Sequence, residues 1–323
     1  MAGSKLDLST KLTLGELTKR TANGNLMTIA NVLESMISVI EDGHWVKCNK
    51  DTYHLYSQWL EEPTGEWSAI NTGVGTYAGR SKPGEQGVGM LEAYSFVDDR
   101  LISKVRDRAR ARMQEDMAFI RGLTKTFGTG LLYGNSAIDI RVFDGWATRY
   151  WDPTNQDNVW DVGGSGSDNT SIYIVQWGPE LCYFIFPEGS ETSLKHEDLE
   201  KKLVYDGNNN PFQCWVSHFI IEAGFVVNDP RAFQRIGSIE SVGAANIFDP
   251  DLLIQALDEM PYEGIGAAIY LNKKVLTQMK IASKDKTNVN YTWEDAFGKR
   301  KLLHFEEIPV KRFDQILITE DAI

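Results

Sequence analysis

The glycine-rich segment at residues 73–79 is the motif of this sequence that comes nearest to a nucleotide-binding loop. Its glycines are spaced one residue too widely for a dinucleotide fingerprint. The next segment, residues 80–84, contains a proline and cannot begin the helix whose N-terminus would hold a pyrophosphate. A second glycine group, at 128–134, closes a predicted helix instead of opening one. We therefore expect no phosphate site and no nucleotide cofactor.

The histidines, cysteines and carboxylates are the other groups that could bind a metal or transfer protons. Cys214 and His218 stand four residues apart, but the sequence offers no second pair to complete a zinc site. The acidic groups at 196–198 and 258–259 could pair a general acid with a base, although solvated helix ends are the simpler interpretation. Walker, nucleophile-elbow and zinc-protease motifs are absent. The sequence thus predicts no catalytic residue, no metal and no cofactor.

The charge balance restricts the classes of partner. The chain has 33 Lys and Arg against 45 Asp and Glu, a net charge of −12, which argues against a general nucleic-acid binder or a protein held on an anionic membrane. No apolar run approaches the ~18 residues of a transmembrane helix, and none near Met1 predicts a signal peptide. Three cysteines are too few for a disulfide framework, which fits a reducing cytoplasm.

The strongest helix pattern covers residues 98–127. At a rise of ~1.5 Å per residue, such a helix would be roughly 45 Å long and would form the spine of an elongated domain. It carries eight basic and five acidic residues. Because the acids are interleaved, we favour a solvated or salt-bridged face. Contact with nucleic acid, or of Arg108 and Arg112 with an acidic surface of a neighbouring subunit, stays open.

Two segments before this helix lack a covering core. Residues 26–41, which follow a short predicted helix at 13–22, have an apolar stripe that includes Leu33 and Ile37. In residues 45–97, aromatic side chains first alternate with polar ones, and the later part contains many glycines. This pattern predicts a long polar two-stranded ribbon. Since an isolated ribbon is marginal in water, both segments need a partner surface.

The rest of the chain is rich in β-strand patterns. We expect strands at 171–177, 181–186, 212–227 and 265–271, helices at 250–258 and 272–283, and two short strands within 301–318 broken at Pro309. Strands and helices do not alternate regularly, so the order predicts an α+β fold. Nine tryptophans and 11% aromatic residues indicate large buried contacts, some of them between subunits.

Several blocks of residues follow one another in a distinctive order and spacing. They are Gly89–Tyr94 with Val97 and Asp98, Leu131–Ala137, Gly163–Ile172, Trp177–Pro179, Ile185–Ser190, Leu194 with His196–Leu199, Val226–Arg231 with Arg235 and Ile236, and the short Glu307–Arg312. Together they resemble the major capsid protein of tailed bacteriophages with the Hong Kong 97-type capsid fold. The resemblance covers about residues 13–240 and is weaker afterwards.

The resemblance implies a division of the chain and a structural role. The implied parts are an N-terminal arm (1–44), an extended β-hairpin loop (45–97), a peripheral domain with its spine helix (98–235), an axial domain (236–300) and return strands to the peripheral domain (301–323). The implied function is self-assembly through pentamers and hexamers into the icosahedral head that encloses double-stranded DNA, without enzymatic activity.

The implied partners are further copies of the chain, with scaffolding, portal and decoration or cementing proteins. DNA would be enclosed without sequence-specific binding, no membrane would be involved, and the virion capsid would be assembled in the host bacterial cytoplasm. Some relatives cross-link a lysine to an asparagine, for which Lys82 is a candidate; a cementing protein is the alternative. Intersubunit contacts are predicted at Leu33, Ile37, Trp59, Trp67, Lys82, Arg108 and Arg112.

Two alternatives remain at this stage. One is an encapsulin-type compartment shell, which shares the fold and encloses a cargo enzyme. The other is a soluble α+β enzyme that uses acids such as Glu197 or Asp229.

Overall fold

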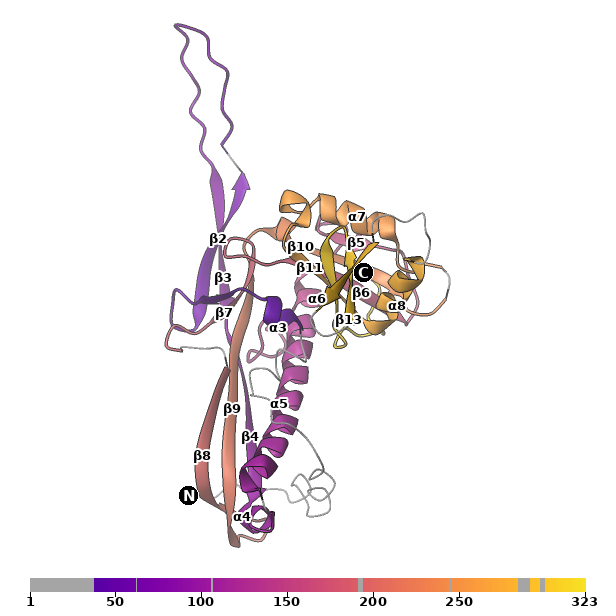
Figure 1. Cartoon of the computed structure of the whole chain (residues 1–323). Helices are drawn as coiled ribbons and strands as arrows, with labels where there is room; N and C mark the ends of the chain where they lie inside the picture. Colours follow the sequence, from indigo (N-terminus) through magenta and orange to yellow (C-terminus); the bar gives the residue numbers. More distant parts are fainter. Residues whose placement is uncertain are drawn as a thin grey trace.

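The computed structural model describes residues 38–61, 63–105, 107–190, 194–243, 245–283, 291–296 and 300–323. The predicted helix at 13–22 and most of the one at 26–41, with Leu33 and Ile37, lie outside these residues. The described end of the second is α3, Ser38–Asp42. The described residues form an elongated body from which a narrow ribbon projects (Figure 1).

The ribbon is a two-stranded sheet, shorter than the sequence pattern suggested. It consists of β2 (Tyr53–Glu61) and β3 (Arg80–Gly87). The remaining strands of the predicted segment, β1 (Trp45–Lys47) and β4 (Gly89–Asp98), belong to the body. The alternating pattern of apolar and polar residues occurs both in a half-buried strand of a sheet and in a free ribbon, so it could not separate the two.

A five-stranded sheet forms the long part of the body. Its order is β1-β7-β9-β4, with β8 also paired to β9. The further strands are β7 (Cys182–Phe186), β8 (Leu194–Tyr205) and β9 (Pro211–Val227). Strand β8 contains residues 196–198, so these acids lie on a strand and the interpretation as a helix end was wrong. Its charged sequence pairs with β9 because β9 supplies the apolar face of the sheet.

The long helix lies along this sheet, between 108 and 133 instead of 98 and 127. A short helix, α4 (Asp99–Ile102), precedes α5 (Arg108–Tyr133), and Asp107 caps α5 by accepting from the Arg110 N–H. The helix continues through its predicted stop because Leu131 and Leu132 are fully buried, and this packing outweighs the ~1 kcal/mol propensity cost of a glycine.

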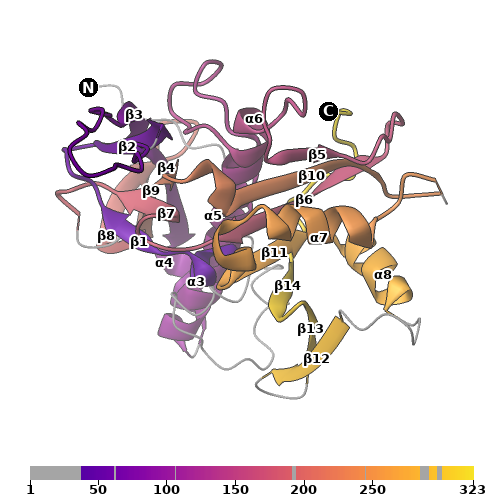
Figure 2. The ribbon, with the colours of Figure 1, turned by 90° about the horizontal axis from the view of Figure 1, so that it is seen from above.

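A seven-stranded sheet forms the second part of the body, in the order β12-β13-β14-β11-β6-β10-β5. Helices α7 and α8 cover one of its faces (Figure 2). The elements are β5 (Val159–Asp161), β6 (Asn169–Gln176), β10 (Phe233–Glu240), α7 (Pro250–Asp258), β11 (Ala267–Leu271), α8 (Lys273–Ala282), β12 (Tyr291–Ala296), β13 (Arg300–Phe305) and β14 (Ile308–Arg312), with short 3₁₀ turns at Pro230–Ala232 and Pro261–Gly264.

The two sheets share one aromatic core, centred on Trp146 at the start of α6 (Trp146–Arg149). Trp146 is fully buried. Its ring lies 5.5 Å from those of Tyr173 and Phe225 and 5.6 Å from that of Phe233, which come from both sheets. The core also receives α5 side chains, so helix and sheets form one packed unit.

The elements confirm the α+β fold and correct several details. Helix α7 has the predicted bounds. Strands β6 and β7, predicted at 171–177 and 181–186, follow each other in the chain and lie in different sheets. Pro309 lies inside β14, and the chain instead reverses at Glu306 and Glu307, both with positive φ. The expected boundary at 235–236 does not follow the sheets, since β10 crosses it and β5 and β6 join β10.

Candidate assembly surfaces

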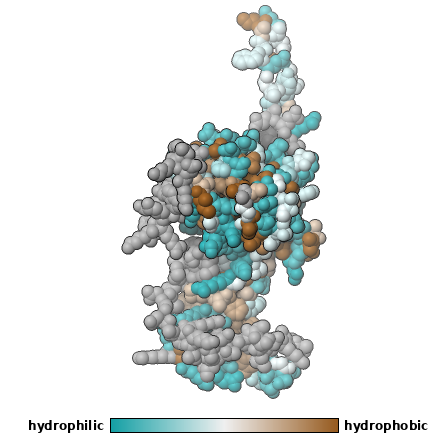
Figure 3. Space-filling view, turned by 90° about the vertical axis from the view of Figure 1, so that its right-hand side faces the viewer, coloured by the Kyte–Doolittle hydropathy of each residue, from teal (hydrophilic) through white to brown (hydrophobic). Residues whose placement is uncertain are grey.

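The ribbon carries large apolar side chains at its free end. Strands β2 and β3 pair antiparallel, and residues 63–79 form an irregular tip beyond them. Trp67 is 102% exposed and Ile70 93% exposed, and Figure 3 shows hydrophobic surface at the end of the projection. We call the exposed apolar side chains of this tip the tip patch: Trp67, Ile70, Val74 and Tyr77.

Polar side chains fix the base of the ribbon to the body. Gln58 Nε2 donates to the Val227 carbonyl at 2.9 Å. Arg149 Nη2 donates to Gln86 Oε1 at 2.6 Å and to the Phe225 carbonyl at 2.9 Å. Burial lowers the pKa of Arg149, and removing an acceptor from a partly buried cation is costly. These contacts therefore hold the direction in which the ribbon leaves the body.

A histidine–tyrosine contact adds to the ribbon base. His54 Nε2 of β2 lies 3.1 Å from the Tyr183 hydroxyl of β7, and the two rings meet edge to face. Burial lowers the pKa of His54 below its usual 6.5. The neutral imidazole therefore fits this contact, and acid weakens it.

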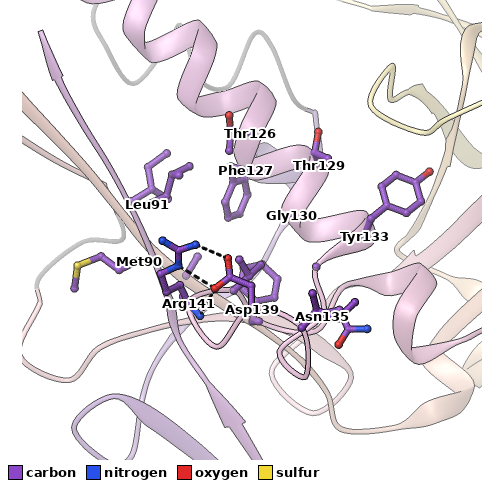
Figure 4. A pocket seen from close by; sticks show the side chains of 17 residues that line it. Met90, Leu91, Thr126, Phe127, Thr129, Gly130, Tyr133, Asn135, Asp139 and Arg141 are labelled. Atoms are coloured by element: carbon purple, nitrogen blue, oxygen red, sulfur yellow. Dashed lines mark hydrogen bonds and ion pairs between the residues drawn. The ribbon is translucent and has the colours of Figure 1, made fainter. Parts of the chain in front are cut away.

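An apolar pocket of about 380 Å³ lies next to the ribbon base, between β4, the second half of α5 and the loop after α5 (Figure 4). Phe127 of α5 points from the helix into the pocket, and Leu91 of β4 lines it as well (Figure 4). At its rim, Arg141 Nε binds Asp139 Oδ1 at 2.9 Å, and Ile138 is 86% exposed. We call it the base pocket; its lining also includes Met90, Thr126, Thr129, Gly130, Tyr133, Val142, Phe143, Ile221 and Ala223.

Glycines shape the turn that closes the base pocket. A Cβ on Gly134 would lie 2.3 Å from the Phe143 carbonyl oxygen, so only glycine fits at the end of α5. The Gly145 N–H in turn donates to the Gly134 carbonyl at 2.8 Å. The loop between them is thereby pinned at both ends, and it presents its apolar residues beside the helix.

The first half of α5 meets the five-stranded sheet through charged groups. Arg112 Nη2 binds Asp198 Oδ1 at 2.7 Å, and its guanidinium lies over the Trp215 ring. Ser217 donates to Asp116 at 3.2 Å, and burial raises the pKa of that carboxyl. The salt-bridged interpretation of the basic helix thus applies to Arg112, whose charge is satisfied within its own subunit.

The structure places the other predicted contact residues at separate points. Trp67 lies in the tip patch, and Lys82 is exposed on β3. Trp59 belongs to β2 by its backbone. Arg108 is exposed at the first residue of α5. Whether these residues touch another subunit stays a prediction, and the structure brings none of them into one site with Arg112.

The chemical motifs weighed in the sequence have structural explanations. His218 stacks on Tyr94 at 4.0 Å between ring centroids and binds Glu92. Asp229 caps a 3₁₀ turn and pairs with Arg231. Within the described ranges, no group of His, Cys, Asp and Glu side chains could hold a metal ion. Nor is any helix there long and apolar enough to span a bilayer.

The three cysteines are all buried and form no disulfide: Cys48, Cys182 and Cys214. Burial raises the pKa of Cys48 to about 11 and that of Cys182 well above its usual value. The thiols of Cys48 and Cys182 are therefore protonated near neutral pH.

Sequence reasoning missed the base pocket. It is assembled from β4, α5 and the loop 135–143, which no local pattern joins. The available signal was the segment between Gly134 and Gly145, in which Ile138, Ile140 and Val142 alternate with charged residues outside any predicted strand. Such aliphatic residues in a short loop indicate a packing or docking surface.

Comparison with known proteins places these surfaces in context. The profile of one family, described as Major capsid protein GP7, matches residues 21–323. A structure of bacteriophage Epsilon15 is 26% identical with a TM-score of 0.69, covering 98% of this chain and 99% of that one. The bacteriophage JBD30 capsid is 8% identical with a TM-score of 0.48, covering 93% and 97%. Comparison with curated proteins gave no significant match.

Proposed function

The chain belongs to the major capsid protein GP7 family, and from this premise we propose that it assembles through pentamers and hexamers into an icosahedral phage head. The role of this family is structural, so the chain is not an enzyme. One observation carries the proposal. The ribbon is hydrogen-bonded to the body through Gln58 and Arg149, and its tip patch is exposed in the isolated chain, with Trp67 102% accessible. Exposed apolar patches of this kind mark protein–protein contacts.

The parts of the fold suggest how the subunit is used. We assign residues 1–44 to an arm and the ribbon with its tip to the extended loop. The five-stranded sheet with α5 corresponds to the peripheral domain, and the seven-stranded sheet with α7 and α8 to the axial domain. Strands β13 and β14 of the predicted return segment 301–323 belong to the seven-stranded sheet, so we assign to the peripheral part only the end of the chain, where Glu320 accepts from Tyr133 of α5.

Many modest contacts between such subunits would hold the shell together. Each projecting part is covered by a neighbouring copy, and a ring of head-to-tail contacts closes on itself. Multivalency then gives a shell that no single contact could hold. Scaffolding, portal and cementing proteins complete the proposed set of partners, and the host cytoplasm is the proposed place of assembly.

An acidic shell would not bind the enclosed DNA tightly. With a net charge of −12, the chain lacks the excess of cations that would neutralise phosphates. We expect the unassembled subunit to bind duplex DNA weakly and without sequence preference. Tight, steeply salt-dependent binding in a filter assay would contradict this part of the proposal.

The function is tested by expressing the full chain and separating the product by size-exclusion chromatography. Negative-stain electron microscopy of the void-volume fraction is expected to show shells or tubes. The matched control replaces residues 62–79 by Asn-Gly, which joins the paired Glu61 and Arg80 by a two-residue turn without the tip patch; it should give folded subunits and few particles. A stable monomer from the unmodified chain, both alone and when co-expressed with the other head proteins of its virion, would overturn the proposal.

A further inference from the structure

Two apolar surfaces of the described residues, the tip patch and the base pocket, stand at opposite ends of the same ribbon. The tip patch lies at the free end, and the base pocket lies beside Gly89–Leu91, directly after β3. We propose that the base pocket of one copy receives the tip patch of the next copy, with Trp67 as the inserted side chain. This inference rests on the proposed function and names the surfaces that meet.

The tip patch cannot reach the base pocket of its own chain. Strand β2 has nine residues, and at ~3.3 Å per residue it separates tip from base by roughly 30 Å. The hydrogen-bonded pairing of β2 with β3 keeps the ribbon extended. Gln58 and Arg149 fix its base, as described above, so the tip points away from the body (Figure 1). A tip patch that enters the base pocket must therefore come from another copy of the chain.

The chemistry of the two surfaces is complementary. The base pocket has about 380 Å³, within the ~300–1,000 Å³ range of pockets that enclose small organic groups. Its walls are mainly apolar: Leu91, Phe127, Val142, Phe143 and Ile221. An aromatic side chain buries about 150–250 Å² when covered, and tryptophan is among the residues enriched at binding hot spots.

One pair of opposite charges could also meet across the two surfaces. Glu66 precedes Trp67 in the chain, and Arg141 lies at the rim of the base pocket with its side chain 83% exposed. Insertion of Trp67 brings the Glu66 carboxylate toward this guanidinium. Arg141 is bound to Asp139 and is held at the rim, where its flat face is also available for an indole.

A second copy of this chain is thus the occupant that the described surfaces favour. Every copy offers one tip patch and one base pocket, so the contact is head-to-tail and repeats from copy to copy. Such heterologous contacts close into rings when the rotation between copies divides a full turn. Such rings agree with pentamers and hexamers. In them, the length of the ribbon would set the distance between the base pockets of neighbouring copies.

Cysteine cross-linking tests the contact directly, because the native thiols are buried. We combine Trp67→Cys with Ile138→Cys at the pocket rim and oxidise assembled particles. A denaturing gel without reductant is expected to show a ladder of cross-linked chains. The matched control pairs Trp67→Cys with Ile281→Cys, which is 59% exposed at the end of α8 and should remain monomeric. Particles that form but give no ladder with the first pair would overturn the inference and leave the proposed function standing.

Filling the pocket gives a second, independent test. Thr126→Trp places a large ring at the mouth of the base pocket, whereas Lys125→Trp changes an exposed neighbour that does not line it. The first variant should raise the subunit concentration needed for assembly about tenfold or more, and the second should not. Circular dichroism checks that both are folded. Equal assembly of the two would overturn the inference, while loss of particles from the unmodified chain would overturn the proposed function itself.

Discussion

Trp146 and Trp67 are the same residue type at the two extremes of this molecule. Trp146 is 0% exposed and lies between aromatic rings of both sheets, whereas Trp67 is 102% exposed at the end of a ribbon. The first completes the core of one subunit. Trp67 is not packed in the core of its own subunit, so burial of its apolar surface can stabilise only contacts between subunits. The same type of side chain is thus used in the core and on the proposed assembly surface. In the core its own subunit buries it, whereas on the assembly surface a neighbouring subunit would have to bury it.

The largest difference is expected when each tryptophan is replaced by alanine. Trp146→Ala should lower the free energy of unfolding by about 3–5 kcal/mol, because it leaves a cavity between the two sheets. Trp67→Ala should change it by less than about 0.5 kcal/mol, as for an exposed residue. Urea unfolding of unassembled subunits measures both.

Trp146→Phe is the control for this comparison. The Trp146 indole N–H has no hydrogen-bond partner among the described residues, so phenylalanine loses only volume. Its cost should be well below that of alanine. A cost for Trp67→Ala equal to that for Trp146→Ala would mean that the tip packs on its own subunit, and the comparison would fail.

A smaller effect is expected at the buried ion pair under the same core. Arg235 Nη2 lies 3.2 Å from Glu320 Oε2, and Ser171 and Tyr133 donate to the same carboxylate. Glu320→Gln keeps the shape but leaves the buried guanidinium without its countercharge. Unfolding should become easier by about 1.5–3 kcal/mol. An unchanged urea midpoint would show that the end of the chain is not held there.

The ribbon base should show a modest dependence on pH. Because burial lowers the folded-state pKa of His54 below 6.5, the unfolded chain binds the proton more tightly. The stability from this group is fully present above pH 6.5 and is lost as the pH falls from 6.5 through the folded-state pKa. His54→Gln should remove this part of the pH dependence in urea titrations between pH 5 and 8. The exposed His44→Gln should retain it, and a reversed result would contradict the assignment.

The smallest effect is expected at the rim of the base pocket. Arg141 and Asp139 form an exposed pair, so Arg141→Gln should leave the urea midpoint of the subunit unchanged within error. In particles, the same variant should weaken assembly more at low salt than at high salt if Glu66 of the next copy faces it. A salt-independent effect on assembly would show that the guanidinium acts by packing alone.

Local signals in the sequence predicted some elements well. Helix α7 was predicted at its observed bounds, and the structure shows local signals that fix its start: Asp249 caps it and Pro250 occupies its first turn. Strand β9 was recognised from its continuous apolar run. By contrast, α5 was ended too early at its glycines, since the packing that overrides their propensity comes from residues far away in sequence.

Other features depend on pairings that no local pattern contains. Strand β8 is mostly charged and is defined by its neighbour β9. The seven-stranded sheet collects strands from residue 159 to residue 312, so the boundary between the two parts could not be placed by reading along the chain. The sequence predicted a ribbon that needs a partner surface, with Trp67 as a contact candidate, whereas the base pocket appears only when three separated segments come together.

The burial of the three cysteines has a practical consequence. A single thiol introduced at the end of the ribbon would react alone with a fluorescent or heavy-atom label, without prior removal of native residues. Such a label would report the environment of every ribbon in a population of particles. The label could follow in real time the burial of each ribbon tip by a neighbouring subunit during assembly.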